Sequence, residues 1–238
     1  MEICGFQRIS LIDYPGKVAS IVFVSGCNMR CPFCHNSDLA LKNYSKLYVY
    51  QQETILRKLR DSGKFIDGVE ITGGEPTLQL DLVDFIMQCK EMGLLVKLDT
   101  NGSNPRKLKE LLDKKLVDYV AMDIKTAPDA AKYSMAIGVN NAAILRNIYE
   151  SIDLLMSSGI EYEFRTTVVP GLVSTEDLMA IAHRINGAKA YYLQQYTPNN
   201  TLDPAYEKLM PFNDSVLIDA CAAIKQQGLV QTCGIRGV

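Results

Sequence analysis

Short apolar runs rich in β-branched residues alternate along this chain with segments whose apolar residues recur at helical spacing. Six such runs predict strands, namely Val18–Ser25, Gly68–Thr72, Leu94–Thr100, Val117–Ile124, Glu161–Val169 and Ala190–Tyr196. Alternation of strands with helices is typical of parallel strands joined by right-handed crossovers. Because six units are too few for an eight-unit barrel, the pattern predicts an α/β fold, a partial (β/α)6 TIM-like barrel of parallel strands.

Local signals mark the ends of the helices between these strands. Asn104 and Pro105 supply an N-cap followed by proline at the first helical position. Ser174 and Asp177 resemble a capping box at the start of another helix. A last helix is predicted from about Asp214 to Gln227, where a glycine follows it.

The length of the chain fits one domain. It has 238 residues, of which 47% are apolar, enough for the core of one α/β domain. No linker, internal repeat or low-complexity tract interrupts the pattern. We therefore expect a single domain over residues 1–238, with a core of about residues 16–200 and a C-terminal helical extension of about residues 201–238.

Charge and apolar content argue against several classes of partner. The net charge of −2 gives no basic field of the kind that attracts nucleic acid. No apolar run is long enough to span a membrane, and no N-terminal stretch has the pattern of a secretory signal. Seven cysteines, three of them within eight residues, favour a reducing compartment over a disulfide framework. We expect a cytoplasmic protein that binds neither membrane nor nucleic acid.

The three crowded cysteines are Cys27, Cys31 and Cys34, in the spacing C-x3-C-x2-C after the first predicted strand. Three thiolates on one loop can hold three corners of an iron–sulfur cube and leave the fourth iron open, as a catalytic site requires. A zinc site completed by His35 is an alternative, since structural zinc takes four ligands. Simple packing of buried cysteines is another.

Polar residues gather at the carboxyl ends of predicted strands, where parallel α/β folds place their sites. Gly73-Gly74-Glu75-Pro76 follows the second strand, and Asp99 lies at the end of the third. Paired glycines let a ligand approach the backbone, although a plain turn explains the same residues.

Charged and aromatic residues extend this set. Asp123 and Lys125 alternate onto one face at the end of the fourth strand, and Arg165 interrupts the apolar fifth strand. Arginine forks onto a carboxylate or a hydroxyl pair, and Phe33 offers a flat apolar surface for a base. Ordinary ion pairs explain the charges equally well, but the whole set suits a zwitterionic nucleoside.

The loop Gly26–Asn36 (GCNMRCPFCHN) resembles the cluster loop of the radical S-adenosylmethionine (SAM) superfamily, and the GGEP run after the second strand strengthens the resemblance. Within the superfamily the chain is similar to activating enzymes of glycyl-radical enzymes, through LDTNG (Leu98–Gly102), MDIK (Met122–Lys125) and RTTVVPG (Arg165–Gly171). Its segment Gly5–Lys17 is similar to anaerobic ribonucleoside-triphosphate reductase activating proteins. The resemblance covers about residues 5–198.

Three differences separate the chain from other activators. Asp13–Lys17 (DYPGK) departs from the DGPGxR pattern of pyruvate formate-lyase activators, and the sixth strand lacks the histidine that they carry. No cysteine-rich insert lies between Asn36 and Tyr50, unlike in activators with additional clusters.

The resemblance implies a radical SAM core in which Cys27, Cys31 and Cys34 hold a [4Fe–4S] cluster whose open iron binds SAM. The catalytic set that it implies also includes Lys125 and Arg165, which face the carboxylate and ribose of SAM. The remaining cofactor contacts that it implies are Phe33, His35 and Asn36 beside the adenine, Gly73, Gly74, Glu75 and Pro76 near the amino group, Asp99 and Asp123 around a possible monovalent cation, and Asn101 and Gln195.

The implied activity is reductive cleavage of SAM to a 5′-deoxyadenosyl radical, which removes a hydrogen atom from a glycine of a partner enzyme. The resemblance favours anaerobic ribonucleotide reductase as that partner, with flavodoxin or ferredoxin as electron donor. Two alternatives remain open. One is a radical SAM enzyme acting on a small molecule or peptide, and the other is a non-enzymatic iron–sulfur or zinc binding protein.

Overall fold

The computed structural model describes residues 1–238, and its contacts divide the chain into two compact units. The first unit comprises Met1–Asn28, Asp38–Thr100 and Arg106–Val120, and the second comprises Met29–Ser37, Asn101–Pro105 and Ala121–Val238. No helix has the length and apolar character needed to cross a membrane.

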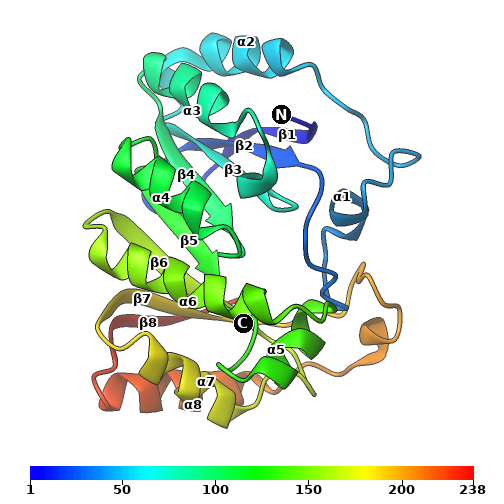
Figure 1. The fold of residues 1–238 in the computed structure, drawn as a ribbon, viewed down its shortest axis with the longest axis vertical. Coiled ribbons are helices and arrows are strands. Elements are labelled where there is room, and N and C mark those ends of the chain that lie inside the picture. The colour runs from blue at the N-terminus through cyan, green and yellow to red at the C-terminus, as the bar shows by residue number, and fades with distance from the viewer. The chain divides into compact units, whose positions relative to one another are not determined.

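The first unit is built on strands β1 (Ile3–Ser10), β2 (Ala19–Val24), β3 (Gly68–Gly73) and β4 (Leu95–Thr100). β1 runs antiparallel to β2, whereas β2, β3 and β4 are parallel neighbours (Figure 1). Its helical segments are α1 (Ser37–Leu41), α2 (Gln52–Ser62), α3 (Leu82–Glu91), α4 (Pro105–Asp113) and two 3-10 turns, Gly63–Phe65 and Pro76–Leu78.

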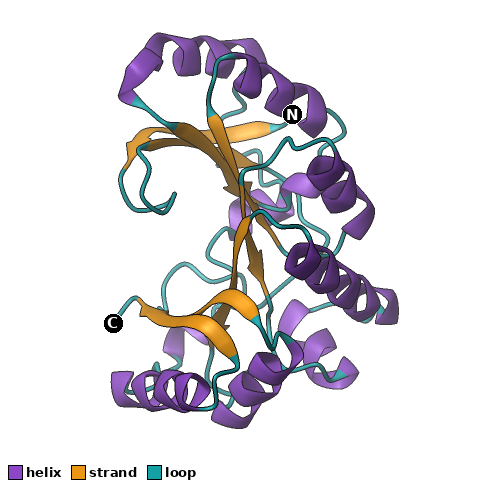
Figure 2. Ribbon diagram, turned by 90° about the vertical axis from the view of Figure 1, so that its left-hand side faces the viewer, coloured by secondary structure: helices purple, strands orange, loops and turns teal.

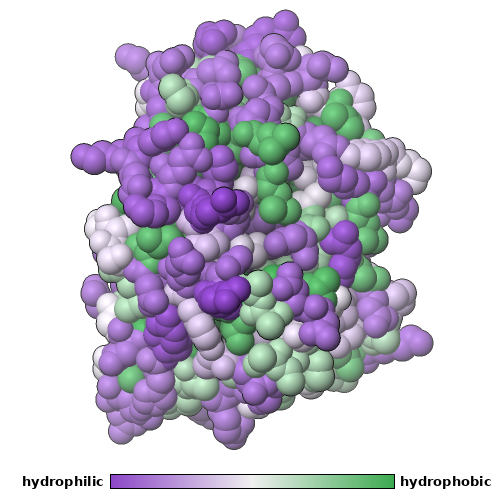
Figure 3. Space-filling model, viewed as in Figure 1, coloured by the Kyte–Doolittle hydropathy of each residue, from purple (hydrophilic) through white to green (hydrophobic).

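Amphipathic helices cover one side of the strands of the first unit (Figure 2). α2 packs on β1 and α3 packs on β4. α2 buries Ile55, Leu56 and Leu59, while its charged residues face solvent and give the largely hydrophilic upper surface in Figure 3. The opposite faces of β3 and β4 are thereby left to carry polar side chains.

The second unit contains the parallel strands β6 (Glu161–Val168), β7 (Ala188–Gln195) and β8 (Val230–Arg236). Its helical segments are α5 (Ala130–Ile137), α6 (Ala142–Ser157), α7 (Thr175–Arg184), α8 (Asp214–Gln226) and a 3-10 turn, Tyr206–Lys208. α8 packs on β7 and β8, and the core includes the fully buried Phe164, Tyr191 and Leu193.

Strand β5 (Tyr119–Asp123) begins in the first unit and ends in the second. Just before β5, the Asp118 amide donates to the Val96 carbonyl of β4 at 2.9 Å. Just after β5, the Ile124 amide donates to the Arg165 carbonyl of β6 at 2.8 Å. Each end of β5 is thus bonded to the neighbouring strand of its own unit.

All six predicted strands are present, as β2 to β7, with ends within two residues of the prediction. The predicted capping box at Ser174 and Asp177 and the helix start at Pro105 are confirmed. The sequence reading missed β1 and β8, and the predicted helical extension ends in β8 rather than in helix. Both missed strands contain a glycine, Gly5 or Gly234, which weakens a strand signal.

These two glycines have a packing reason. A Cβ atom on Gly5 would lie 3.1 Å from the side chain of Phe23, and one on Gly234 would lie 2.6 Å from the ring of Tyr192. Each glycine therefore lets an aromatic ring of the neighbouring strand lie across the missing side chain. The sequence of one strand does not show this, because it depends on the register with the next.

The cysteine loop Met29–Ser37 is fixed by backbone contacts within the second unit. The Arg30 amide donates to the Ile137 carbonyl at the end of α5 at 2.7 Å, and the Asp203 amide donates to the Pro32 carbonyl at 2.9 Å. Gly138 ends α5 with a positive φ of 64°, and a Cβ there would lie 2.1 Å from the Arg30 carbonyl oxygen. The loop thus depends on glycine at this helix end.

We predict that Gly138→Ala lowers the free energy of unfolding by about 3 kcal/mol or more, because it combines a left-handed backbone with a backbone clash. Gly159→Ala is the matched control, since Gly159 has a φ of 76° but a Cβ added there would meet no atom within 4 Å. The control should lose about 1–2 kcal/mol, the cost of the left-handed conformation alone. Anaerobic urea unfolding measures both, and equal losses would contradict the clash.

Candidate active site

The GGEP loop of the first unit packs against the segment that leads into Cys27. The Gly74 amide donates to the Val24 carbonyl at 2.8 Å, and the Glu75 amide donates to the Gly26 carbonyl at 2.8 Å. A Cβ on Gly73 would lie 2.6 Å from the Val24 oxygen, and one on Gly74 would lie 2.1 Å from the Gly26 oxygen. Both glycines are therefore required by close packing of backbone on backbone.

Glu75 is fully buried and stabilises this loop from inside. Its Oε1 accepts hydrogen bonds from the Thr77 amide at 3.1 Å and from the Thr100 hydroxyl at 2.8 Å. It caps the 3-10 turn that begins at Pro76. Glu75 thus fixes the shape of the loop, and the predicted contact between this loop and the amino group of a ligand stays a prediction.

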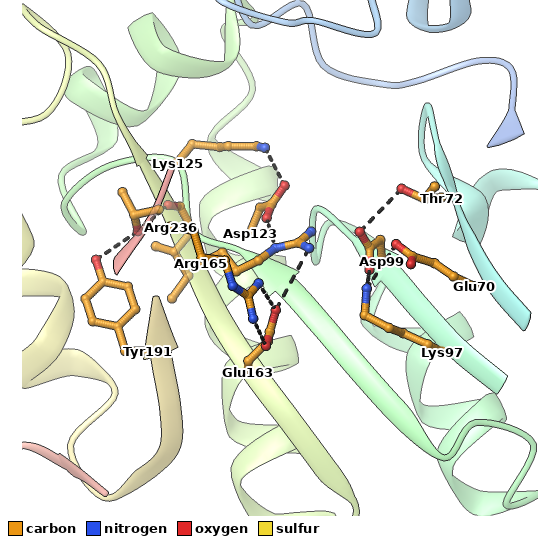
Figure 4. Close-up of polar contacts among 12 residues, drawn as sticks. Glu70, Thr72, Lys97, Asp99, Asp123, Lys125, Glu163, Arg165, Tyr191 and Arg236 are labelled. Carbon is orange, nitrogen blue, oxygen red and sulfur yellow. Dashed lines mark hydrogen bonds and ion pairs between the residues drawn. The ribbon is translucent and has the colours of Figure 1, made fainter. Parts of the chain in front are cut away.

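Three charged side chains of β3 and β4 form a buried cluster in the first unit (Figure 4). Lys97 Nζ lies 3.0 Å from Glu70 Oε1 and 2.6 Å from Asp99 Oδ1, and Thr72 Oγ1 donates to Asp99 Oδ2 at 3.4 Å. Glu70 Oε2 is buried with no hydrogen-bond partner. Burial and the nearby Asp99 raise the pKa of Glu70 to about 8, although Lys97 opposes the shift.

The second unit has its own charged cluster, built around Asp123 at the end of β5 (Figure 4). Lys125 Nζ donates to Asp123 Oδ2 at 2.9 Å, and Arg165 Nε donates to Asp123 Oδ1 at 2.8 Å. One carboxylate therefore holds two cations side by side. The predicted trio of Asp123, Lys125 and Arg165 is brought together by the structure.

Lys125 also lies beside two of the three loop cysteines. Burial alone would lower its pKa, but Asp123, Cys31 and Cys34 together raise it above the ordinary value for lysine. Burial raises the pKa of Cys34, while Lys125 and the Asn36 amide oppose that shift. The Cys34 amide donates to the Cys31 carbonyl at 3.0 Å, so the two cysteines share a tight turn.

The donor set of the loop fits an iron–sulfur cluster. None of the seven cysteines forms a disulfide bond. Thiolates are the usual ligands of such clusters, and a lysine near Cys31 and Cys34 favours their ionised form. Cys27 belongs to the first unit and the other two to the second. No three His, Cys, Asp or Glu side chains form a ready-made metal site, so the triad stays a prediction from the sequence.

Four other residues were predicted to contact the cofactor, and the structure places them as follows. Phe33 is buried, and His35 Nε2 lies 2.9 Å from the Thr197 carbonyl oxygen. Asn36 lies in the same loop, and its backbone amide donates a hydrogen bond to the Cys34 side chain. Asn101 is buried, and its side chain accepts from the Ser103 amide at 2.9 Å, which makes it a turn residue.

The side chain of Gln195 bonds the segment at the start of α8, and its predicted contact with the cofactor stays a prediction. Its amide nitrogen donates to Asp214 Oδ1 and to the Phe212 carbonyl, both at 2.9 Å, so the side chain points to the start of α8. By strand alternation, Gln194 shares the face of Tyr192, on which Arg236 stacks. Gln194 and Gln195 therefore lie on opposite faces of β7.

Two charged residues of the second cluster were missed. Glu163 is fully buried, and Arg236 binds both of its oxygens, at 2.6 and 2.8 Å. Glu163 precedes Arg165 by two positions, so alternation on β6 was an available signal. Arg236 lies on β8, which the sequence reading assigned to a helical extension.

Comparisons with known sequences point to one family. The model of the Radical SAM superfamily matches residues 21–185. A protein of Methanocaldococcus jannaschii named as a glycyl-radical enzyme activating enzyme is 36% identical over 208 residues, or 87% of this chain and 85% of that protein. The pyruvate formate-lyase-activating enzyme of Clostridium pasteurianum is 30% identical over 87% of this chain and 86% of its own length.

Solved structures show the same fold at lower identity. Streptococcus suis SuiB has a TM-score of 0.70 at 17% identity, covering 92% of this chain and 49% of SuiB. The chain thus spans about half the length of SuiB. A structure of TYW1 with a lysine-pyruvate adduct has a TM-score of 0.63 at 14% identity, covering 87% of this chain and 73% of TYW1. These likenesses concern the fold alone and confirm the predicted fold class.

We predict that the stability of the protein falls relative to Glu70→Gln as pH rises. The folded pKa of about 8 lies above the ordinary value for glutamate, so the folded state holds a proton that the unfolded chain releases. The stabilisation that this proton gives to the folded state is complete in acid and is lost as pH rises through the folded pKa of Glu70. Between about pH 6 and 8 the wild type should lose roughly 2 kcal/mol relative to the variant. Urea unfolding at several pH values measures this, and parallel stability curves would contradict it.

Proposed function

Since the chain belongs to the radical SAM superfamily, we propose that it generates a glycyl radical on a partner enzyme. Membership makes it an enzyme that uses a [4Fe–4S] cluster and SAM. Two relatives named as activating enzymes, at 36% and 30% identity, match more than four fifths of both chains and support this activity. We further propose that the cluster ligands are Cys27, Cys31 and Cys34.

The observation that carries the proposal is the charge balance of the residues around Asp123, among which Lys125 lies beside Cys31 and Cys34. Lys125, Arg165 and Arg236 are three cations, whereas Asp123 and Glu163 supply two carboxylates. These five side chains therefore sum to one net positive charge, which suits the carboxylate of an amino-acid ligand. Because Lys125 and Arg165 are held by one aspartate, they present that charge in a fixed direction.

The roles of the residues follow from this arrangement. When bound, the reduced cluster and SAM supply a 5′-deoxyadenosyl radical. Lys125 and Arg165 hold the ligand's carboxylate, and Asp123 orients both cations. Glu75 keeps the GGEP loop in shape for the ligand's amino group. A glycine of the partner suits hydrogen removal because it has no Cβ to block the approach.

We propose anaerobic ribonucleotide reductase as the partner, with flavodoxin or ferredoxin as the electron donor, in the cytoplasm. The similarity of Gly5–Lys17 to that group of activators supports the reductase. At Asp13–Lys17 the chain lacks the DGPGxR pattern of pyruvate formate-lyase activators, which argues against pyruvate formate-lyase as the partner.

We predict that Cys31→Ala abolishes cleavage of SAM, with at least a ~100-fold loss of 5′-deoxyadenosine formed after anaerobic reconstitution and reduction with dithionite. Cys89→Ala is the matched control, because Cys89 is a fully buried core residue of α3. It should retain cluster content and activity. Iron and labile sulfide are measured alongside the product. A Cys31→Ala protein that still forms 5′-deoxyadenosine at the wild-type rate would remove the assignment.

The partner is tested separately by electron paramagnetic resonance. The reconstituted protein, SAM and reductant should give a glycyl radical signal on anaerobic ribonucleotide reductase and none on pyruvate formate-lyase. The reverse pattern would reassign the partner and leave the chemistry of the loop in place.

A further inference from the structure

Glu163 lies between two arginines of the second unit, and the two contacts are unequal (Figure 4). Arg236 Nη1 and Nη2 donate to Glu163 Oε1 and Oε2 at 2.6 and 2.8 Å, a two-point contact. Arg165 Nη1 stays 4.0 Å from Oε1 of the same carboxylate. Because the Glu163 side chain is 0% exposed, an arginine must remain beside it.

Arg236 itself is held in place from two sides. Its guanidinium stacks at 3.9 Å from the centre of the Tyr192 ring, and Gly234 gives that ring room over β8. Burial would lower its pKa, but the Glu163 contacts raise it above the ordinary value for arginine. Arg236 is therefore a permanent cation fixed on Glu163.

This fixed pair decides where Arg165 points. With both Glu163 oxygens bound by Arg236, Arg165 directs its Nε to Asp123 at 2.8 Å. Without Arg236, Glu163 would be a buried anion with Arg165 Nη1 at 4.0 Å. A move of Arg165 toward Glu163 would break its contact with Asp123, and the loss of the Arg236 charge would leave the five side chains with no net positive charge.

We propose that Arg236 is a positioning residue for SAM binding, which occupies Glu163 so that Arg165 stays on Asp123 and faces the carboxylate of SAM. The inference rests on the proposed function for the role of Arg165. It gives strand β8 a role in SAM binding, although none of the predicted site residues lies on that strand.

The experiment compares three variants by equilibrium dialysis of SAM against anaerobically reconstituted protein. Arg236→Met keeps a long side chain over Tyr192 but removes the charge, and it should weaken SAM binding at least tenfold. Glu163→Gln combined with Arg236→Met removes the buried anion as well, and it should restore binding to within about threefold of wild type. Because removal of the buried Glu163 charge also relieves any loss of stability, the Nε signal of Arg165 separates the positioning role from a stability effect.

Arg184→Met is the matched control. Arg184 also pairs with a carboxylate, Asp153 at 2.7 Å, and also stacks on a tyrosine ring, Tyr149 at 5.0 Å, but it lies on α7 and its partners belong to α6. It should bind SAM as the wild type does. Wild-type affinity in Arg236→Met, or no recovery in the double variant, would overturn the inference.

A second readout needs no SAM. The 15N–1H signal of the Arg165 Nε group, assigned with an Arg165→Lys variant, reports its bond to Asp123 in the protein before SAM is added. It should shift in Arg236→Met, return in the double variant and stay unchanged in Arg184→Met. If the wild type failed to bind SAM, the proposed function would fail, whereas an Arg165 signal unmoved by Arg236→Met would sink the inference itself.

Discussion

The structure depends on pairing charged side chains that lie on the inner faces of largely apolar strands. A buried carboxylate without a cation is strongly destabilising, and removing one partner of such a pair costs about 3–5 kcal/mol. Each unit meets this constraint with its own residues. Lys97 joins Glu70 to Asp99 in the first unit, and Asp123 and Glu163 each contact two cations in the second. The pairing is what gives the polar faces fixed geometry.

The two clusters differ in net charge, and this difference separates their chemistry. The first has two carboxylates and one lysine, so it relieves the excess negative charge by holding a proton on Glu70 near neutral pH. In the second, Lys125, Arg165 and Arg236 face Asp123 and Glu163, so these five side chains sum to one net positive charge, which favours an anionic group. This is why we propose Lys125 and Arg165, rather than the first cluster, as the partners of the SAM carboxylate.

Much of this could be predicted from the sequence. The strands β2 to β7 are encoded by local apolar runs, and the family follows from the cysteine spacing together with the GGEP loop. Lys125, Asp123 and Arg165 were predicted as site residues because charged side chains are rare in apolar strands unless they are paired or bind a ligand. What failed depends on register. Strands β1 and β8 were missed because each contains a glycine that makes room for an aromatic ring of the neighbouring strand.

Glycines also have a packing reason that the sequence alone does not show. The approach of a ligand at Gly73 and Gly74 stays a prediction, and each of the two also faces a backbone oxygen, of Val24 and Gly26, within the first unit. In the second unit Gly138 plays the same part against Arg30. The backbone of the cysteine loop is thus held before Cys27 by one set of contacts and before Cys31 by another. Because these contacts use main-chain groups, they fix the loop without drawing on the side chains of the cysteines that we propose as cluster ligands.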